Sequence, residues 1–395
     1  MRILVRKQAD GSVRSCTLFH IQLALSFVGV KHAHIQQILD RIVHDPLLDT
    51  AHDRSIELEQ LLTRLKAYFA TFHYTNSLTD LKVAWDIVQR QDSVCILLGG
   101  TSGCGKSTLA SLLAHRIGIT TVLSTDHIRS LLRSFDTENP LLWASSYHAG
   151  ETLPQRRNEQ EEDTVAGYEA QSQLILDTLD KMLTGFRNRR ESLVIEGVGL
   201  SIENIKALLK KHPNCIPLIV YISNEQKHAE RFAIRAKYMT LAPRANKYIR
   251  YFDNIRLIQD HLCRQADKCQ IPKIDNTNVD RSLAILHMTI VNVLSRMRQL
   301  KESGQADGTS NILPIVSEEF AKVYRVTWSS KQMLRRIREN STLPRIRKTE
   351  QEDPLLDQQR GGPQHHGNSN PVNTIVTYPN RWKAKASRFL THRWS

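Results

Sequence analysis

One stretch, residues 95–118, constrains the fold more than any other: four apolar residues lead into glycines, then a lysine, two hydroxyl residues and a helical pattern. Within it, Gly100, Gly105, Lys106 and Ser107 match the phosphate-binding pattern G-x-x-x-x-G-K-[ST]. Glycines allow backbone conformations that turn several N–H groups around an anion, and the start of the following helix adds positive potential. We therefore predict a strand, a phosphate-binding loop and a helix that starts near Lys106 and ends at Gly118.

Two side chains of this loop suit a nucleoside triphosphate with its metal. Lys106 offers a mobile positive charge for the terminal phosphates, and Ser107 offers an oxygen ligand for Mg²⁺. We expect ATP and Mg²⁺ as cofactors, with the nucleotide contacted by Gly100, Thr101, Ser102, Gly103, Cys104, Gly105, Lys106, Ser107 and Thr108. The alternative, a glycine-rich turn with a chance lysine, is disfavoured by the strand-like run before the loop and the helical pattern after it.

Strand-like and helical segments alternate from about residue 92 to 300, which predicts an α/β fold with a parallel sheet covered on both faces. The region 159–190 is expected to be mostly one long helix with an apolar stripe. Ligands of such sheets gather at the carboxyl ends of the strands, so residues there are the first site candidates. The strand candidates are VCILLGG, TTVLST, SLVIEG, IPLIVYIS and IPKID.

Acidic residues follow two of these strands. Asp126 comes after the second strand, where it can accept a proton from an acceptor hydroxyl or hold Mg²⁺, or can simply cap the next helix. Glu196 ends the third strand, where an acidic residue orders Mg²⁺ in P-loop proteins, although a carboxylate at an ordinary turn is the alternative. With Ser107, these two residues form the expected metal site.

Basic residues are expected to face the anionic ligands. Arg129 and Arg133 share a helix face with Asp126 and are candidates for binding an anionic acceptor. Arg231 and Arg235 are predicted to reach the transferred phosphoryl group from a lid, where forked guanidinium groups neutralise charge, and Lys237 is a substrate-binding candidate. The alternative for this segment is a solvated basic helix.

Two further residues carry weaker signals. Asn276 follows the last strand, where it either borders the nucleotide or caps the final helix. His148 lies in an insertion after the second strand, where it either binds an anionic acceptor or is packed in the core.

The 395-residue chain divides into three expected parts: residues 1–88, 89–300 and 301–395. The first contains a strand hairpin around Asp10-Gly11, followed by helical patterns. The last holds sixteen Lys and Arg against nine Asp and Glu, half of the +14 net charge of the chain, and is expected to be largely disordered. Within it, residues 318–340 are a candidate for one basic helix or for a docking segment. Its tail mixes basic and aromatic residues, so docking to protein, nucleic acid or lipid competes with a solvated tail.

Six cysteines without paired metal spacing, together with the lack of a membrane-length apolar run, indicate a reduced cytoplasmic protein without a membrane span. The excess positive charge favours small phosphorylated anions as ligands, with nucleic acid as a lesser possibility.

Several separated motifs resemble the 2-phosphoglycerate kinase family, which includes the plant low-phytic-acid P-loop proteins. They are GGTSGCGKSTLASLLAHRIGITTVLSTDHIRSLLRSF, NPLLWASSYHAGE, LVIEGVGL and RFAIRAKYM, in this order over roughly residues 90–300. The N-terminal ILVRKQADGSVRSCTLFHIQLALSFVGV resembles an ATP-cone domain.

The resemblance implies a P-loop kinase of nucleoside-kinase-like architecture that phosphorylates 2-phosphoglycerate to 2,3-bisphosphoglycerate with ATP. It also implies the nucleotide site at residues 100–108, with Asp126 and Glu196 in the acidic positions. Two other functions stay open at this point: a kinase for an inositol phosphate or polynucleotide end, and a regulatory protein that binds ATP without transferring phosphate.

Overall fold

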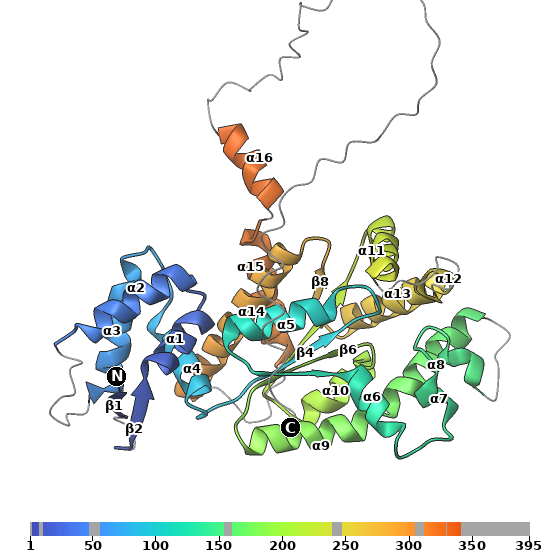
Figure 1. The fold of residues 1–395 in the computed structure, drawn as a ribbon, viewed down its shortest axis with the longest axis horizontal. Helices are drawn as coiled ribbons and strands as arrows, with labels where there is room; N and C mark the ends of the chain where they lie inside the picture. The colour runs from blue at the N-terminus through green and yellow to red at the C-terminus, as the bar shows by residue number, and fades with distance from the viewer. Residues whose placement is uncertain are drawn as a thin grey trace, which may run out of the picture. The chain divides into compact units, whose positions relative to one another are not determined.

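Five parallel strands form the sheet that carries the candidate site (Figure 1). Each coincides with one of the predicted strand segments. Because β4 is central, its carboxyl end is flanked by the ends of both neighbouring strands. The order across the sheet is β5 (Thr121–Ser124), β6 (Leu193–Gly197), β4 (Cys95–Gly99), β7 (Cys215–Tyr221) and β8 (Lys273–Asp275).

Alternating side chains of these strands enter two separate apolar cores. Ile96 and Leu98 of β4 belong to one core, whereas Cys95 and Leu97 belong to the other. This period of two is the pattern of a strand buried on both faces. The sheet is therefore covered by helices on both sides, which confirms the predicted α/β fold of P-loop type.

The computed structural model describes residues 2–7, 11–46, 56–153, 160–238, 247–304, 312–328 and 330–340. The helices after β4 follow in chain order. They are α5 (Lys106–Ile117), α6 (Thr125–Leu132), α7 (Pro140–Trp143), a 3₁₀ turn η1 (Ala149–Thr152), α8 (Gln160–Gln173), α9 (Leu176–Asn188), α10 (Ile202–Lys211), α11 (Glu225–Tyr238), α12 (Lys247–Arg250), α13 (Phe252–Lys268) and α14 (Val279–Glu302).

The N-terminal elements form a small sheet with helices, as expected. β1 (Arg2–Arg6) and β2 (Val13–Thr17) pair antiparallel, which confirms the hairpin, although residues 8–10 of its turn lie outside the described part. A short strand that the sequence did not predict, β3 (Ile56–Glu57), pairs parallel to β1. The helices are α1 (Leu18–Phe27), α2 (His32–Val43), α3 (Leu58–Ala70) and α4 (Leu78–Val88).

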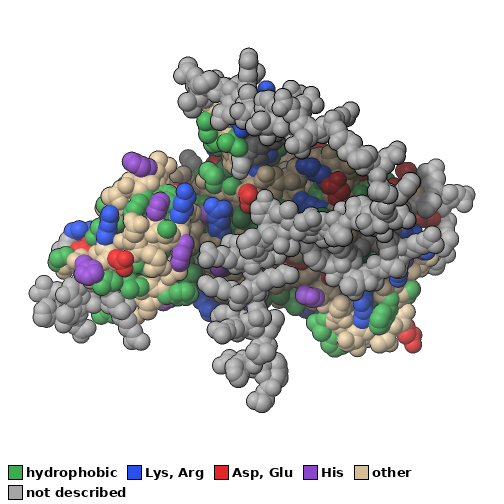
Figure 2. Space-filling model, turned by 45° about the horizontal axis from the view of Figure 1, so that its top comes forward, with side chains coloured by type: hydrophobic (Ala, Val, Ile, Leu, Met, Phe, Trp, Pro, Cys, Tyr) green, Lys and Arg blue, Asp and Glu red, His purple; other side chains and the backbone are tan. Residues whose placement is uncertain are grey.

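The N-terminal helices share one apolar core with the face of the sheet that carries Ile96 and Leu98 of β4. α1 packs against α4 and α5, and α4 packs against α14. Three polar contacts add to this packing: His287 to the Phe27 carbonyl, Ser295 to Asp80 and Arg298 to Asp86. On the face drawn in Figure 2, Lys, Arg and His side chains are spread among apolar ones over the N-terminal elements.

The expected long helix over 159–190 is wrong in one respect, because α8 and α9 are separate helices. The Ser172 hydroxyl donates to the Tyr168 carbonyl at 2.8 Å, and Nδ2 of Asn204 donates to the Ser172 carbonyl at 2.7 Å. These bonds compete with the helical ladder and end α8 just before Ile175. The competing partner, Asn204, lies far along the chain, so the local pattern could not reveal the break.

Two helices, α15 (Leu313–Val326) and α16 (Ser330–Asn340), replace the single basic helix considered for 318–340. α15 packs on α14 and buries Val316 and Val323. Residues 1–341 form one compact unit, and the basic-aromatic tail lies outside the described residues. The three-part division of the chain stays a prediction. Within the described ranges, no helix is both long and apolar enough to cross a bilayer.

Candidate active site

The glycine-rich loop runs from the end of β4 into α5, as predicted, and its shape depends on glycine. Gly100 has φ +144°, and a Cβ there would lie 2.2 Å from the Val220 carbonyl oxygen. Gly103 has φ +77°, and a Cβ there would lie 2.4 Å from the Phe232 ring. Both the backbone conformation and the close neighbours therefore exclude side chains at these positions.

Lys106 is buried at the first position of α5. Its Nζ donates to the Thr101 carbonyl at 2.7 Å and lies 3.8 Å from Cys104 Sγ. The Thr101 hydroxyl oxygen is buried and has no hydrogen-bond partner among the described residues. Cys104 is a buried free thiol that donates to the Thr101 carbonyl, which fits a packed loop residue. Lysine and hydroxyl thus lie together inside the loop.

Ser107 and Glu196 meet at the start of α5. The Ser107 hydroxyl donates to Glu196 Oε1 at 3.0 Å, and Glu196 is 5% exposed at the end of β6. These two oxygen-bearing side chains are the ligand types that Mg²⁺ takes in phosphate-transferring sites. The residues present therefore fit the metal that the loop implies.

Asp126 lies on the same edge of the sheet. Ser124 pairs with Glu196 in the β5–β6 register, and α6 starts one residue later. The N-cap of α6 is Ser124, whose hydroxyl accepts from the Asp126 N–H, so Asp126 is not the capping residue. Its half-exposed carboxylate bonds instead to Arg129 at 3.1 Å.

Arg129 joins Asp126 to the insertion that follows α6. Its Nη1 donates to the Ala144 carbonyl at 2.9 Å and to Gln171 Oε1 at 2.8 Å, while its Nη2 reaches Asp126. Burial lowers the pKa of Arg129 from its ordinary value, and the Asp126 charge opposes this shift. Thr125, Asp126, Arg129, Ser146, Gln171, Ile175 and Gly199 line a small cavity here.

Arg133 and His148 make mainly packing and backbone contacts, whereas the sequence made them candidates for binding an anionic acceptor. Arg133 Nε donates to the Leu142 carbonyl at 2.7 Å, and its guanidinium lies 5.1 Å from the centre of the Trp143 ring. His148 stacks on Tyr147 at 5.4 Å, and its Nδ1 is buried without a partner in the described part of the chain. Both residues hold the insertion in place beside the cavity without lining it.

The α11 helix lies against the loop through Arg231. Its Nη1 donates to the Cys104 carbonyl at 3.1 Å, and its Nη2 donates to the Asn276 carbonyl. Arg235 and Lys237 belong to α11, but their side chains lie outside the described residues. Among the predicted lid residues, the structure thus places only Arg231 at the nucleotide loop.

Asn276 holds the loop from the carboxyl end of β8, the outermost strand on one side of the sheet. Its Nδ2 donates to the Cys104 carbonyl at 2.8 Å, and its Oδ1 is buried without a described partner. The N-cap of α14 is Asn278, whose side chain accepts from the Arg281 N–H. The capping alternative for Asn276 is therefore wrong, and its side chain lies beside the phosphate loop.

Three residues at this site were not singled out from the sequence: His228 and Phe232 on α11, and Gln171 on α8. His228 and Phe232 share a helix face with Arg231, so their spacing was a usable signal. Gln171 gave no such signal, because its partners Leu141, Ala144 and Arg129 all come from distant segments.

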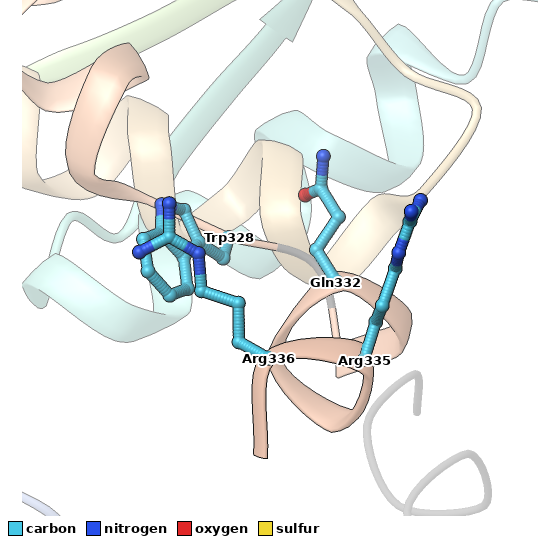
Figure 3. Close-up of a pocket in the computed structure, with 4 residues that line it drawn as sticks. All are labelled: Trp328, Gln332, Arg335 and Arg336. Atoms are coloured by element: carbon cyan, nitrogen blue, oxygen red, sulfur yellow. The ribbon is translucent and has the colours of Figure 1, made fainter. Parts of the chain in front are cut away.

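A second cavity lies away from this edge, between α16 and the segment that follows α15. Its lining residues are Trp328, Gln332, Arg335 and Arg336 (Figure 3). The Arg336 guanidinium lies 3.6 Å from the centre of the Trp328 ring. The cavity is lined by Trp328 and one face of α16 and contains none of the residues of the glycine-rich loop.

Relatives with matching sequence include two archaeal enzymes and one eukaryotic protein. The 2-phosphoglycerate kinase of Methanopyrus kandleri is 31% identical over 220 residues, covering 55% of this chain and 67% of that protein. That of Methanocaldococcus jannaschii is 27% identical over 263 residues, covering 66% and 83%. An uncharacterized protein of Dictyostelium discoideum is 50% identical over 266 residues, and the match spans 67% of this chain but only 32% of that protein.

Fold and site together define a P-loop protein of the phosphate-binding α/β class. From the similarity to the archaeal enzymes, the chain belongs to the 2-phosphoglycerate kinase family. No protein-family model matches the sequence. Solved structures that align include a shikimate kinase from Acinetobacter baumannii, with TM-score 0.31 and 16% identity over 56% of this chain and 99% of that one.

Proposed function

We propose that the protein is an ATP-dependent small-molecule kinase whose acceptor is a phosphorylated alcohol, with 2-phosphoglycerate as the first candidate. The observation that carries this proposal is the Ser107–Glu196 contact at 3.0 Å beside the buried Lys106. This contact lies at the same edge of the sheet as the glycine-rich loop and the Lys106 ammonium, so phosphate-binding and metal-binding groups are next to one another. The names of the archaeal relatives support the choice of acceptor.

Each residue at this edge has a role in the proposal. Lys106 holds the terminal phosphates of ATP, and the loop amides bind their oxygens. Ser107 and Glu196 hold Mg²⁺, which would neutralise charge on the phosphates when bound. Arg231 adds positive charge next to the loop, and Arg235 extends the same helix. These contributions stabilise the charge that the transferred phosphoryl group carries.

The acceptor side of the proposal rests on the small cavity. Asp126 accepts the proton of the acceptor hydroxyl as the new P–O bond forms and the bond to the leaving ADP breaks. It follows two residues after Ser124, which pairs with Glu196 in the sheet register, and from there it helps to order the metal. Arg129 supplies positive charge for the anionic group of the acceptor, and Gln171 holds Arg129 in place. Arg133, His148 and Lys237 are peripheral contacts in this proposal. A cytoplasmic location is part of the same proposal.

An acceptor screen tests the proposal. Purified full-length protein is incubated with radiolabelled ATP, Mg²⁺ and one acceptor at a time: 2-phosphoglycerate, 3-phosphoglycerate, an inositol phosphate mixture, or a polynucleotide with a free 5′ hydroxyl. We expect label in bisphosphoglycerate with 2-phosphoglycerate and little with the others. Transfer to an inositol phosphate or a polynucleotide would show that the acceptor belongs to that class instead. ATP binding without any transfer would identify an ATP-sensing protein.

A further inference from the structure

One face of α11 contacts three consecutive residues of the nucleotide loop. His228 Nε2 donates to the Ser102 carbonyl at 2.8 Å, and Arg231 donates to the Cys104 carbonyl at 3.1 Å. Between them, the Phe232 ring fills the space that Gly103 leaves open. His228, Arg231 and Phe232 stand at helical spacings of three and four, which places them on the same side of the helix.

The hydrogen bond fixes which ring nitrogen of His228 carries a proton. A carbonyl oxygen only accepts, so Nε2 must carry the proton. Nδ1 is buried and has no partner in the described part of the chain. The ring is fully buried, with ring centres 5.2 Å from Phe232 and 5.5 Å from Phe252. A second proton at Nδ1 would therefore place an unsatisfied charge against aromatic rings, and the imidazole stays neutral.

Because side chains of α11 bind two loop carbonyls, they also determine where the neighbouring loop amides point. In a planar trans peptide the C=O and the following N–H point in opposite directions. The carbonyl of Ser102 shares its peptide with the N–H of Gly103, and the carbonyl of Cys104 shares its peptide with the N–H of Gly105. Since both carbonyls are bound on the α11 side, both amides face away from α11. An anion cradle needs its amides preset in this way, before the ligand arrives.

We infer that His228 is a positioning residue of the nucleotide site, which holds the Gly103 amide ready for the ATP phosphates through the Ser102 carbonyl. The inference rests on the proposed function in one respect, because ATP is taken as the ligand of the loop. His228 acts only through the loop backbone.

Three substitutions separate a donor role from a packing role. In His228→Gln the amide nitrogen takes about the position of Nε2, in His228→Asn it takes about the position of Nδ1, and His228→Phe keeps the ring without a donor. Direct titration with Mg·ATP measures affinity without any acceptor. We expect Gln to stay within about threefold of wild type, and Asn and Phe to weaken binding about tenfold, which corresponds to the loss of about 1.4 kcal/mol.

The matched control is His261→Phe on α13, where the histidine bonds to Glu169 at 3.0 Å and is not at the loop. Its ATP affinity should equal that of the wild type. The Michaelis constant for the acceptor should stay within about twofold in all variants, because His228 does not line the acceptor cavity. Thermal unfolding of each variant records whether the fold is kept.

Two results overturn the inference: binding by His228→Phe that equals or exceeds that of His228→Gln, or equal binding by Gln and Asn. If His228→Phe does not fold, the comparison of Gln with Asn decides alone. Failure of the proposed function gives a different result, since the wild-type protein would then bind Mg·ATP without transferring phosphate, or would not bind it at all.

The pH dependence of the wild type supplies an independent check. Burial lowers the pKa of His228, and the positive groups that face it, Arg256 on α13, Arg231 on α11 and Lys106 on α5, lower it further. A second proton on Nδ1 leaves the Nε2–H donor in place, and the lowered pKa keeps the imidazole neutral above its ordinary range, so we expect the affinity ratio of wild type to His228→Gln to be flat from pH 8 to 6.5. The ratio cancels the titration of ATP itself. A ratio that changes severalfold between pH 8 and 6.5 would show that His228 titrates there and contradicts a neutral donor at this position.

Discussion

The Ser107 hydroxyl donates to Oε1 of Glu196 across 89 residues of sequence, at a distance of 3.0 Å. Ser107 is the second residue of the helix after the central strand, and Glu196 is the last residue but one of the neighbouring strand. The register that pairs Leu98 with Glu196 sets this contact. A metal bound here would therefore be held by two rigid elements, which favours a fixed geometry at the phosphates.

The first prediction concerns Lys106. Lys106→Ala removes the buried cation of the loop, and we expect turnover to fall by at least about 10³-fold because the phosphoryl charge loses its main protein partner. The measurement is steady-state kinase activity with 2-phosphoglycerate. The control Lys206→Ala removes an exposed lysine paired with Glu203 and should leave turnover unchanged. Retained turnover in a folded Lys106→Ala protein would contradict the assignment of the loop.

The second prediction concerns the metal-binding pair. Glu196→Gln keeps the hydrogen bond that Ser107 donates but removes the negative charge, so the Mg²⁺ concentration for half-maximal activity should rise about tenfold. Ser107→Ala removes the other oxygen and should act in the same direction. Because the two side chains touch, their combined effect should be smaller than the sum of the separate effects. A Mg²⁺ titration of the four proteins measures this, and additive effects argue against a shared metal.

The third prediction concerns Asp126. If its carboxylate accepts the proton of the acceptor hydroxyl, Asp126→Asn should lower turnover by about 10²–10⁴-fold while ATP affinity is kept. The control Asp136→Asn changes an exposed carboxylate beyond α6 that bonds to Asn139. A loss of tenfold or less would assign Asp126 to holding Arg129 rather than to proton transfer.

The fourth prediction concerns Gln171, which is buried and accepts a hydrogen bond from Arg129 at 2.8 Å. Gln171→Ala frees the guanidinium to move, so the Michaelis constant for the acceptor should rise about tenfold. ATP binding, measured by direct titration, should not change. An equal loss of affinity for ATP and acceptor would show a general loss of structure instead.

The fifth prediction concerns stability against pH. Burial lowers the pKa of His287 to about 4, from an ordinary value of 6.5. Between these values the unfolded chain binds the proton and the folded protein does not, so stability is complete above pH 6.5 and is lost as the pH falls toward 4. The full loss is about 3 kcal/mol, and between pH 7.5 and 5 it is about 2 kcal/mol.

The variant His287→Gln isolates this contribution, because an amide nitrogen can still donate to the Phe27 carbonyl that Nε2 contacts at 2.7 Å. Urea unfolding of both proteins at pH 7.5 and 5 gives the difference directly, and titration of the other groups cancels. The wild type should lose about 2 kcal/mol more than the variant over this range. Parallel losses would show that His287 is protonated as readily in the folded protein as in the unfolded one.

Local patterns were sufficient to predict the sheet and the loop. Most strands of the central sheet are apolar runs that end where a turn, loop or helix begins, and the loop has a glycine spacing that few other structures require. The acidic residues at strand ends could be located as well, because parallel strands bring their carboxyl ends to one edge.

Contacts between distant segments could not be predicted in this way. The break between α8 and α9 depends on Asn204, and the position of Arg129 depends on Gln171 and the Ala144 carbonyl. Asn276 was expected near the nucleotide or at a helix cap, but its bond to the Cys104 carbonyl spans 172 residues. Such pairings depend on how the helices pack on the sheet, which the local sequence pattern does not specify.

The packing of α1 and α4 on α5 and α14 has a practical consequence for shortened versions of the chain. Leu23 of α1 lies against Gly118 at the end of α5, and Arg298 of α14 bonds to Asp86 of α4. A protein starting at residue 89 would expose the apolar sides of two long helices to water. We expect such a fragment to aggregate when expressed alone, whereas a fragment ending at residue 341 keeps every one of these contacts.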